Sequence, residues 1–256
     1  MSEVIRALQW NIGGGKVRHP DADPTLFPYD QEGLEEIIDT IEESNADIVT
    51  LQETHENGSS SQTAEIAEAA GYPYWVNDHY GESHIDPDYH LGQAVISRYP
   101  LDNHTFQTFI NPGYTAEWAT RSHDKGVTSV HLALGNKAVL QAQTLHAVPF
   151  RAFGVDPYSE LAKPVLEDME ARVLATSIGD GILQGDFNLD YPSLLEFFPQ
   201  LLRSGRFEEV LQALGTTPKG GKIDHILYSG VVLVRSEVVS KVLTDHYPIV
   251  TDFARK

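Results

Sequence analysis

The sequence contains no cysteine, which excludes disulfide bonds, thiolate metal sites and a cysteine nucleophile. It also has no apolar run close to the roughly 20 residues that a membrane-spanning helix requires. The first ten residues lack the basic start and the apolar core of a secretion signal. We therefore expect a soluble, cytoplasmic protein that has no membrane span and acts as a monomer.

Basic residues are scarce, because 18 Lys and Arg stand against 37 Asp and Glu and the formal net charge is -19. Such a charge repels polyanions at long range, which argues against passive coating of nucleic acid. It is compatible with a divalent metal site, since carboxylates build such sites and the ion reverses the local field. The length of 256 residues, without a break in composition, predicts one domain that spans residues 1–256.

Apolar periodicity predicts a chain that mixes hairpins with helical crossovers. Strands are expected at residues 4–10, 47–51, 74–77, 93–97, 105–110, 127–134, 137–146, 181–184, 223–228, 231–240 and 249–253. Helices are expected at residues 31–44, 62–70, 158–177 and 193–203, and a polar loop at 78–91. A Gly135-Asn136 turn favours an antiparallel hairpin. This pattern predicts mixed sheets covered by helices.

Polar residues follow several of the predicted apolar strands, where a rigid scaffold can bring separate side chains to one point. Five such segments occur, at residues 9–12, 51–54, 144–146, 185–188 and 244–248. Hydrolysis of a phosphodiester needs an ion that neutralises phosphate charge, a base that activates water, and donors for the non-bridging oxygens. The five segments supply each of these residue types.

In this order the segments resemble the endonuclease/exonuclease/phosphatase superfamily, which has the DNase I-like fold. Its pattern has Trp-Asn near the start, Gln-Glu after an early strand, Gly-Asp-x-Asn past the middle and Ser-Asp-His-x-Pro at the end. Residues 92–101 and 222–226 resemble two further family segments, and the match runs from about residue 5 to residue 253. The resemblance implies an α/β (α+β) four-layered sandwich, in which two packed, mixed and mainly antiparallel sheets are flanked by helices.

The resemblance also implies a magnesium site, with Mn²⁺ as a substitute ion. Glu53 would be the main ligand, because a hard dication favours carboxylate oxygen and keeps several waters. Asn11 would assist the metal or its water, and Asp245 would help to hold the metal or orient a histidine. Asp186 would position or deprotonate the attacking water, and Asn188 would bond a phosphate oxygen.

Two histidines receive roles from the same resemblance. His246 would act as a hydrogen-bond donor or general acid at the phosphate. His146 would donate to the phosphate or to the leaving oxygen, with Asp224 fixing its tautomer through the second ring nitrogen. The other histidines follow no pattern that assigns a role.

Substrate choice depends on loops that the family pattern does not specify. Lys16, Arg121 and Arg151, together with Lys125, lie in or near predicted mouth loops, where they would bind a second phosphate or a short nucleic-acid strand; a solvated surface explains them equally well. The first hypothesis is a phosphodiesterase that acts on nucleic acid or a nucleic-acid adduct. The alternative is a phosphatase or phosphodiesterase for a small or lipid phosphoester, such as an inositol phosphate or sphingomyelin. A non-catalytic scaffold is less favoured, because the acid-base residues are all present.

Overall fold

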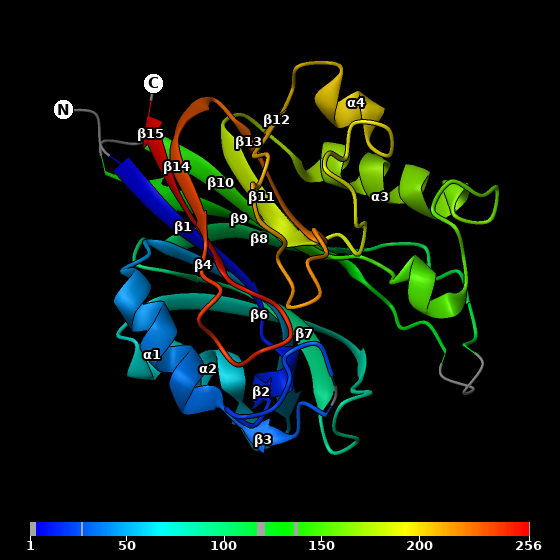
Figure 1. The fold of residues 1–256 in the computed structure, drawn as a ribbon. Helices are drawn as coiled ribbons and strands as arrows, with labels where there is room; N and C mark the ends of the chain where they lie inside the picture. The colour runs from blue at the N-terminus through cyan, green and yellow to red at the C-terminus, as the bar shows by residue number, and fades with distance from the viewer. Residues whose placement is uncertain (1–3, 27, 117–120, 136–137, 256) are drawn as a thin grey trace.

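The protein, described as a computed structural model for residues 4–26, 28–116, 121–135 and 138–255, is built from two sheets packed face to face. Figure 1 shows α1 and α2 on one side of the strands and α3 and α4 on the opposite side. The order of layers is therefore helices, sheet, sheet, helices, which confirms the predicted four-layered sandwich. None of the helices within these ranges is long and apolar enough to cross a membrane.

The first sheet has seven strands and carries both the first and the last described strands of the chain. Its order is β14 (Val231–Val238), β15 (Ile249–Arg255), β1 (Val4–Asn11), β4 (Ile48–Asn57), β7 (His90–Ser97) and β6 (Tyr74–Glu82), with β5 (Ser60–Ser61) paired to β4. The pair β1 and β4 is parallel, and the remaining pairs are antiparallel. The sheet is mixed and mainly antiparallel, as predicted.

The second sheet has six strands in the order β12 (Glu208–Glu209), β13 (Asp224–Ser229), β11 (Gly181–Asp186), β10 (Ala138–His146), β9 (Gly126–Leu134) and β8 (Leu101–Thr108). Only β10 and β11 pair in parallel within it. The antiparallel β9 and β10 confirm the predicted hairpin, although its turn at Asn136 lies outside the described residues. A separate pair joins β2 (Lys16–Val17) and β3 (Gln31–Glu32).

The helices follow the apolar periodicity of the sequence. They are α1 (Leu34–Ser44), α2 (Gln62–Ala69), α3 (Lys163–Thr176) and α4 (Pro199–Leu202), and two 3₁₀ turns lie at Gly13–Gly15 (η1) and Phe150–Phe153 (η2). Ile37 and Ile41 of α1 are one turn apart and both buried, so they face the first sheet. Met169 of α3 is fully buried against Leu183 of β11, and such burial contributes roughly 2 kcal/mol for each side chain.

A third apolar cluster fills the space between the two sheets. Ile5 and Ile48 from the first sheet meet Ile182 and Ile226 from the second, and all four side chains are almost completely buried. Each pair of neighbouring layers is thus held by its own apolar cluster. The polar strand ends are the parts of the sheets that this packing leaves available for chemistry.

The structure differs from the sequence prediction in several elements: residues 31–32 of the helix expected at 31–44 form β3, and the strand expected at 105–110 is β8, Leu101–Thr108. The loop expected at residues 78–91 is wrong at both ends, because β6 continues to Glu82 as a half-exposed edge strand and β7 begins at His90. The helix expected at 158–177 begins only at Lys163, since Pro164 suits the first turn of a helix. The helix expected at 193–203 is reduced to α4, which also begins at a proline.

Candidate active site

The polar strand ends converge on one cleft of about 730 Å³. Glu53, Asp245 and the pair Asp186 and Asn188 line it together with both predicted histidines. His146 and Asp186 are Cα partners on β10 and β11, and Asp186 and Asp224 are Cα partners on β11 and β13. Three neighbouring strands therefore present His146, Asp186 and Asp224 at the same height of the second sheet.

Unusual backbone positions carry several of these side chains. Glu53 has a φ of 55° and lies where the register of β4 and β7 shifts, between Gln52 and Thr54. A bulge of this kind redirects a side chain, and a non-glycine residue at positive φ is uncommon enough to suggest a functional constraint. The residue before Asp186 is Gly185, and β10 and β11 approach so closely there that a Cβ would lie 2.1 Å from the Leu145 carbonyl oxygen.

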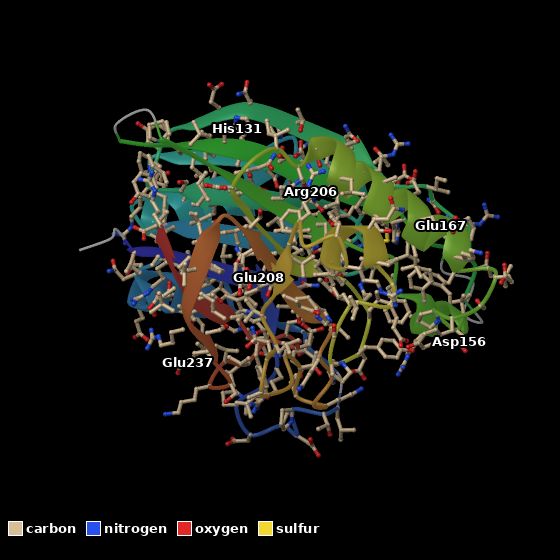
Figure 2. All side chains as sticks on the ribbon, turned by 90° about the horizontal axis from the view of Figure 1, so that it is seen from above. His131, Asp156, Glu167, Arg206, Glu208 and Glu237 are labelled. Carbon is tan, nitrogen blue, oxygen red and sulfur yellow. The ribbon has the colours of Figure 1, made fainter. Side chains whose placement is uncertain are left out.

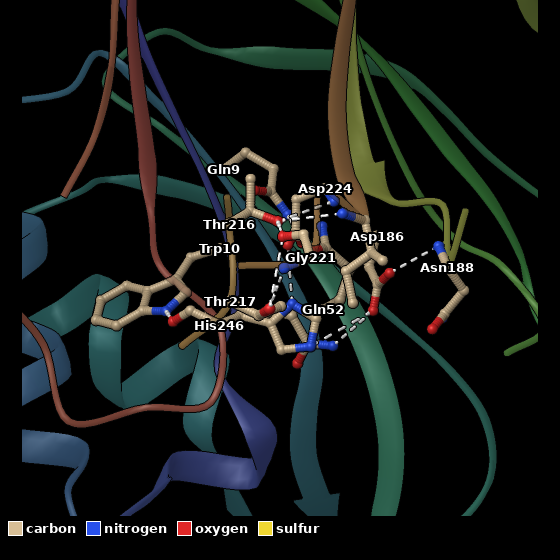
Figure 3. Close-up of polar contacts among 12 residues, drawn as sticks. Gln9, Trp10, Gln52, Asp186, Asn188, Thr216, Thr217, Gly221, Asp224 and His246 are labelled. Atoms are coloured by element: carbon tan, nitrogen blue, oxygen red, sulfur yellow. Dashed lines mark hydrogen bonds and ion pairs between the residues drawn. The ribbon is translucent and has the colours of Figure 1, made fainter. Parts of the chain in front are cut away.

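Asp186 is the most completely bonded carboxylate of the cleft. Its Oδ2 accepts from Asn11 Nδ2 at 3.0 Å, and its Oδ1 accepts from the Asn188 backbone N–H at 2.9 Å. Its Oδ2 also lies 3.8 Å from His246 Nε2 (Figure 3). Burial raises the pKa of Asp186 to about 7, although His246 acts in the opposite direction. The carboxylate is thus a base with a pKa near neutral pH.

His246 is held by a second buried carboxylate. Its Nδ1 lies 2.9 Å from Asp224 Oδ2. Burial alone would lower the pKa of His246, but Asp224, followed by Asp186 and Asp245, raises it well above the ordinary value. The ring is therefore an imidazolium near neutral pH, with Nε2–H on the side of Asp186. The expectation that Asp224 orients His146 is wrong, because the partner of Asp224 is His246.

His146 has different surroundings, which the sequence did not reveal. Its Nδ1 lies 2.9 Å from the Tyr80 hydroxyl and 3.0 Å from Lys125 Nζ. Burial, and then the charge of Lys125, lower the pKa of His146 well below its ordinary value. An ammonium can only donate, so the ring must offer it a lone pair and is neutral. His146 and His246 thus differ in charge, although both line the same cleft.

Polar side chains beneath the cleft join the two sheets. Gln9 Nε2 donates to Gln52 Oε1 at 2.7 Å and to Asp224 Oδ1 at 3.0 Å, and Gln52 Nε2 donates to Thr144 Oγ1 at 2.8 Å. Figure 3 shows Gln9 and Gln52 directly beside Asp224 and His246. Such a network limits movement of Asp224, because each buried amide would lose a partner. The network lies just behind residues that face the cleft.

Two groups of residues in this cleft could hold a metal ion. Asp186, Asp224 and His246 offer ligand atoms within 4.8 Å of one another. The 2.9 Å bond between His246 Nδ1 and Asp224 Oδ2 competes with that arrangement, because it already engages one candidate ligand atom of each residue.

The second group consists of Glu53, Asp245 and Asn11. Glu53 and Asp245 both line the cleft, and an oxygen of Asp245 faces Gly13, whose N–H donates to Asn11 Oδ1 at 3.1 Å. These are oxygen donors, which suit Mg²⁺ or Mn²⁺. Glu53 and Asp245 bring two carboxylates to this part of the cleft, so the charge of one divalent cation would balance theirs.

The predicted substrate-binding cations occupy different places. Lys16 and Arg121 line the cleft, and Lys16 is ion-paired with Glu32. Arg151 does not line it; its guanidinium lies 5.5 Å from the Tyr191 ring centroid in a neighbouring depression. The depression adjoins the cleft, because Arg151 belongs to η2 and the next two residues of η2 line the cleft.

The remaining walls of the cleft were not predicted. His84 and His123 line it and stack with ring centroids 5.7 Å apart. A lone histidine in a polar loop gives no sequence signal for such a place. The apolar part of the lining consists of Ile85, Ala116, Val148, Pro149, Ala152 and Phe153.

Known proteins share this arrangement of the chain. Residues 8–246 match the family described as the endonuclease/exonuclease/phosphatase family. An endonuclease/exonuclease/phosphatase from Beutenbergia cavernae has a similar structure, with a TM-score of 0.76 and 18% identity over 98% of this chain and 72% of that chain. A comparison with curated protein sequences found no match.

Two more similar structures carry names that indicate an activity. A 3′ phosphatase from Neisseria, bound to a product DNA hairpin, has a TM-score of 0.61 and 16% identity over 97% of this chain and 99% of that chain. A mannosyl-6-phosphatase from Bacteroides thetaiotaomicron has a TM-score of 0.59 and 14% identity, covering 98% of this chain and 99% of that chain. At these identities the likeness shows the fold, and the family follows from the sequence match. The chain belongs to the endonuclease/exonuclease/phosphatase family of phosphoester hydrolases.

Proposed function

We propose that this protein is a divalent-metal-dependent hydrolase in which water attacks the phosphorus of a phosphoester. The observation that carries the proposal is one cleft in which Asp186 Oδ2 lies 3.8 Å from His246 Nε2; burial raises the pKa of Asp186 to about 7, and Asp224, against the effect of burial, raises the pKa of His246. Phosphoryl transfer to water requires a base that accepts the proton of the water and a charged donor that stabilises the phosphate. We also propose that residues 1–256 act as one domain, because both sheets contribute to this cleft.

The roles of the side chains follow from their contacts. Asp186 accepts the proton of the attacking water, held in place by Asn11 and by the Asn188 backbone. His246 donates from Nε2 to a phosphate oxygen while Asp224 stabilises its charge. Asn188 binds another phosphate oxygen with its side chain, one of whose two N–H groups is already used by the Ala147 carbonyl at 3.0 Å.

A metal ion would be held by Glu53, Asp245 and Asn11. Mg²⁺ or Mn²⁺ there would neutralise charge on the phosphate and polarise the bond that breaks. His146 stays neutral beside Lys125 and supplies a hydrogen bond to the phosphate or to the leaving oxygen.

For the substrate, the cleft favours a small phosphoester with an apolar portion. A volume of about 730 Å³ is typical of small-molecule sites, and apolar side chains from η2 and the segments beside it line one wall. The exposed acidic side chains labelled in Figure 2, Asp156, Glu167, Glu208 and Glu237, lie over several elements and would repel a long polyanion. Lys16 and Arg121 would then bind one further anionic group of the substrate.

The end of a nucleic-acid strand is a second candidate, because of the depression beside η2. There Arg151 lies over Tyr191, and Tyr158 packs edge-on against Tyr191 with centroids 5.4 Å apart. Exposed aromatic rings beside an arginine can stack bases. This arrangement would accept a nucleotide next to the scissile phosphate.

A substrate panel tests both candidates. Bis-p-nitrophenyl phosphate, p-nitrophenyl phosphate, inositol phosphates, sphingomyelin and oligonucleotides with phosphorylated ends would each be assayed with Mg²⁺, Mn²⁺ or EDTA. We expect hydrolysis of the small esters that requires metal and is lost in Asp186→Asn. If only oligonucleotides are cleaved, and Tyr191→Ala weakens that cleavage, the nucleic-acid candidate replaces the small ester. Absence of metal-dependent hydrolysis across the panel refutes the proposed function.

A further inference from the structure

Lys125 is a buried cation on the floor of the cleft, outside the motifs that identify the family. It directly precedes β9, and its carbonyl oxygen accepts from the Phe109 N–H at 2.8 Å. The next residue must be small, because a Cβ on Gly126 would lie 2.5 Å from the Gln107 carbonyl oxygen. Close contact between β8 and β9 therefore fixes the height at which Lys125 enters the cleft. The side chain is only 4% exposed.

The partners of this ammonium are neutral. Nζ lies 3.0 Å from His146 Nδ1 and 3.2 Å from His146 Nε2, and 5.0 Å from the centroid of the Tyr80 ring. Among the described residues, no carboxylate oxygen lies within 4.0 Å of Nζ, and Glu53 and Asp186 instead lie 3.7 Å and 3.5 Å from His146 Nε2. Glu53 and Asp186 favour its charge only from a longer distance. Nζ has three N–H donors, and one histidine ring cannot accept all of them.

A buried charge without a partner is costly, so proteins pair buried ammonium groups with an anion. The anion that fits here must enter through the cleft, which Lys125 lines beside Asp186 and His246. In the proposed function Asp186 activates the water that attacks the scissile phosphate, and His246 donates to an oxygen of that phosphate. We infer that Lys125 is a further catalytic residue, whose Nζ donates to a non-bridging oxygen of the scissile phosphate and stabilises the charge on it during attack by water.

This inference rests on the proposed function for the identity of the phosphate, but binding can be measured without turnover. Inorganic phosphate would be titrated calorimetrically into the Mg²⁺-loaded wild type and into Lys125→Met. Loss of one charge-assisted hydrogen bond is expected to weaken phosphate binding on the order of 10- to 100-fold. Lys163→Met, at an exposed lysine of α3 outside the cleft lining, is the matched control and should bind phosphate like the wild type.

A role through His146 alone must be separated from direct contact. If Lys125 only orients His146, then adding Lys125→Met to His146→Ala will not weaken phosphate binding further. Direct contact predicts that the double variant binds phosphate more weakly than His146→Ala. In the same series, Lys125→Met should lower kcat for the best substrate by more than it raises KM.

The possible outcomes distinguish a failure of this inference from a failure of the proposed function. Phosphate binding that depends on Lys125 supports it even when no ester of the panel is hydrolysed. Equal phosphate affinity of the wild type and Lys125→Met overturns it even when the panel is hydrolysed. A wild type that binds no phosphate at all overturns it as well. Thermal unfolding of each variant verifies that the compared proteins are folded.

Discussion

Replacing Lys125 with methionine is expected to stabilise the protein when metal and phosphate are both absent. Burial lowers the pKa of Lys125 from 10.5 to about 8, against the opposing effect of Glu53 and Asp186. The folded protein therefore holds this ammonium less favourably than the unfolded chain does. Methionine has a similar length and no charge, so it removes this penalty while it fills the same space.

The size of the effect follows from the difference between the two pKa values. A fall from 10.5 to about 8 corresponds to roughly 3 kcal/mol of penalty on the charged form. The substitution also loses the contact with His146 and the cation–π contact with Tyr80, which offsets roughly 1–2 kcal/mol. The net gain is about 1–2 kcal/mol, or a rise in melting temperature of roughly 2–8 °C for a chain of this size.

The stability difference between Lys125→Met and the wild type is expected to change with pH in one direction. Below pH 8 the lysine is charged in both states, so the penalty is fully present in the wild type. Between pH 8 and 10.5 the folded protein loses this proton first, and wild-type stability rises relative to that of the variant. The advantage of Lys125→Met should therefore be greatest below pH 8 and shrink above it.

Denaturant unfolding in EDTA at a series of pH values measures this difference directly. Lys163→Met again serves as the control, because an exposed lysine should change stability by no more than about 0.5 kcal/mol. If Lys125→Met is less stable than the wild type at pH 7, that result contradicts the view that the Lys125 ammonium lacks an anionic partner. A gain that does not change between pH 8 and 10.5 contradicts the assigned cause.

Further outcomes are expected for four variants and for the pH profile of the wild type. Asp186→Asn should lower turnover on the order of 10² or more, as steady-state rates would show, and wild-type activity should rise as pH passes about 7, where Asp186 loses its proton. Asp224→Asn should move the alkaline fall in activity to lower pH, because Asp224 raises the pKa of His246; an unmoved profile contradicts their pairing. Glu53→Gln should weaken Mn²⁺ binding by calorimetry on the order of tenfold or more, and unchanged binding removes Glu53 from the metal site. Gly185→Ala should cost roughly 2–3 kcal/mol in denaturant unfolding, since its Cβ would meet the Leu145 carbonyl; a neutral effect contradicts that close approach.

The sequence predicts most of the layers because their signals are local. The apolar run of β1 and the spacing of Ile37 and Ile41 in α1 each report burial without knowledge of the partner. Prediction fails in the second half of β6, because residues 78–82 are mostly polar and lie at the edge of the sheet, so that their sequence resembles a loop. It also fails at helix starts such as α3, where a proline decides the first turn.

For the candidate site, sequence reasoning identifies groups at strand ends but not their pairings. Asp186 and Asn188 stand in a short motif, so their proximity is local. The partner of Asp224 depends on the register of β11 and β13, which the pattern does not give. In the sequence, Lys125 is indistinguishable from the other cations of polar loops. The close pairing of β8 and β9 places it at the floor of the cleft.

The positions of the metal and the phosphate in a crystal would show which side chains bind each of them. Crystals would be soaked with Mn²⁺ and inorganic phosphate, and the ion located by its anomalous scattering. We expect Mn²⁺ to be bound by oxygens of Glu53 and Asp245, and the phosphate to accept a hydrogen bond from His246 Nε2. An ion held by Asp186, Asp224 and His246, or a phosphate bound away from Asp186, would contradict this expectation.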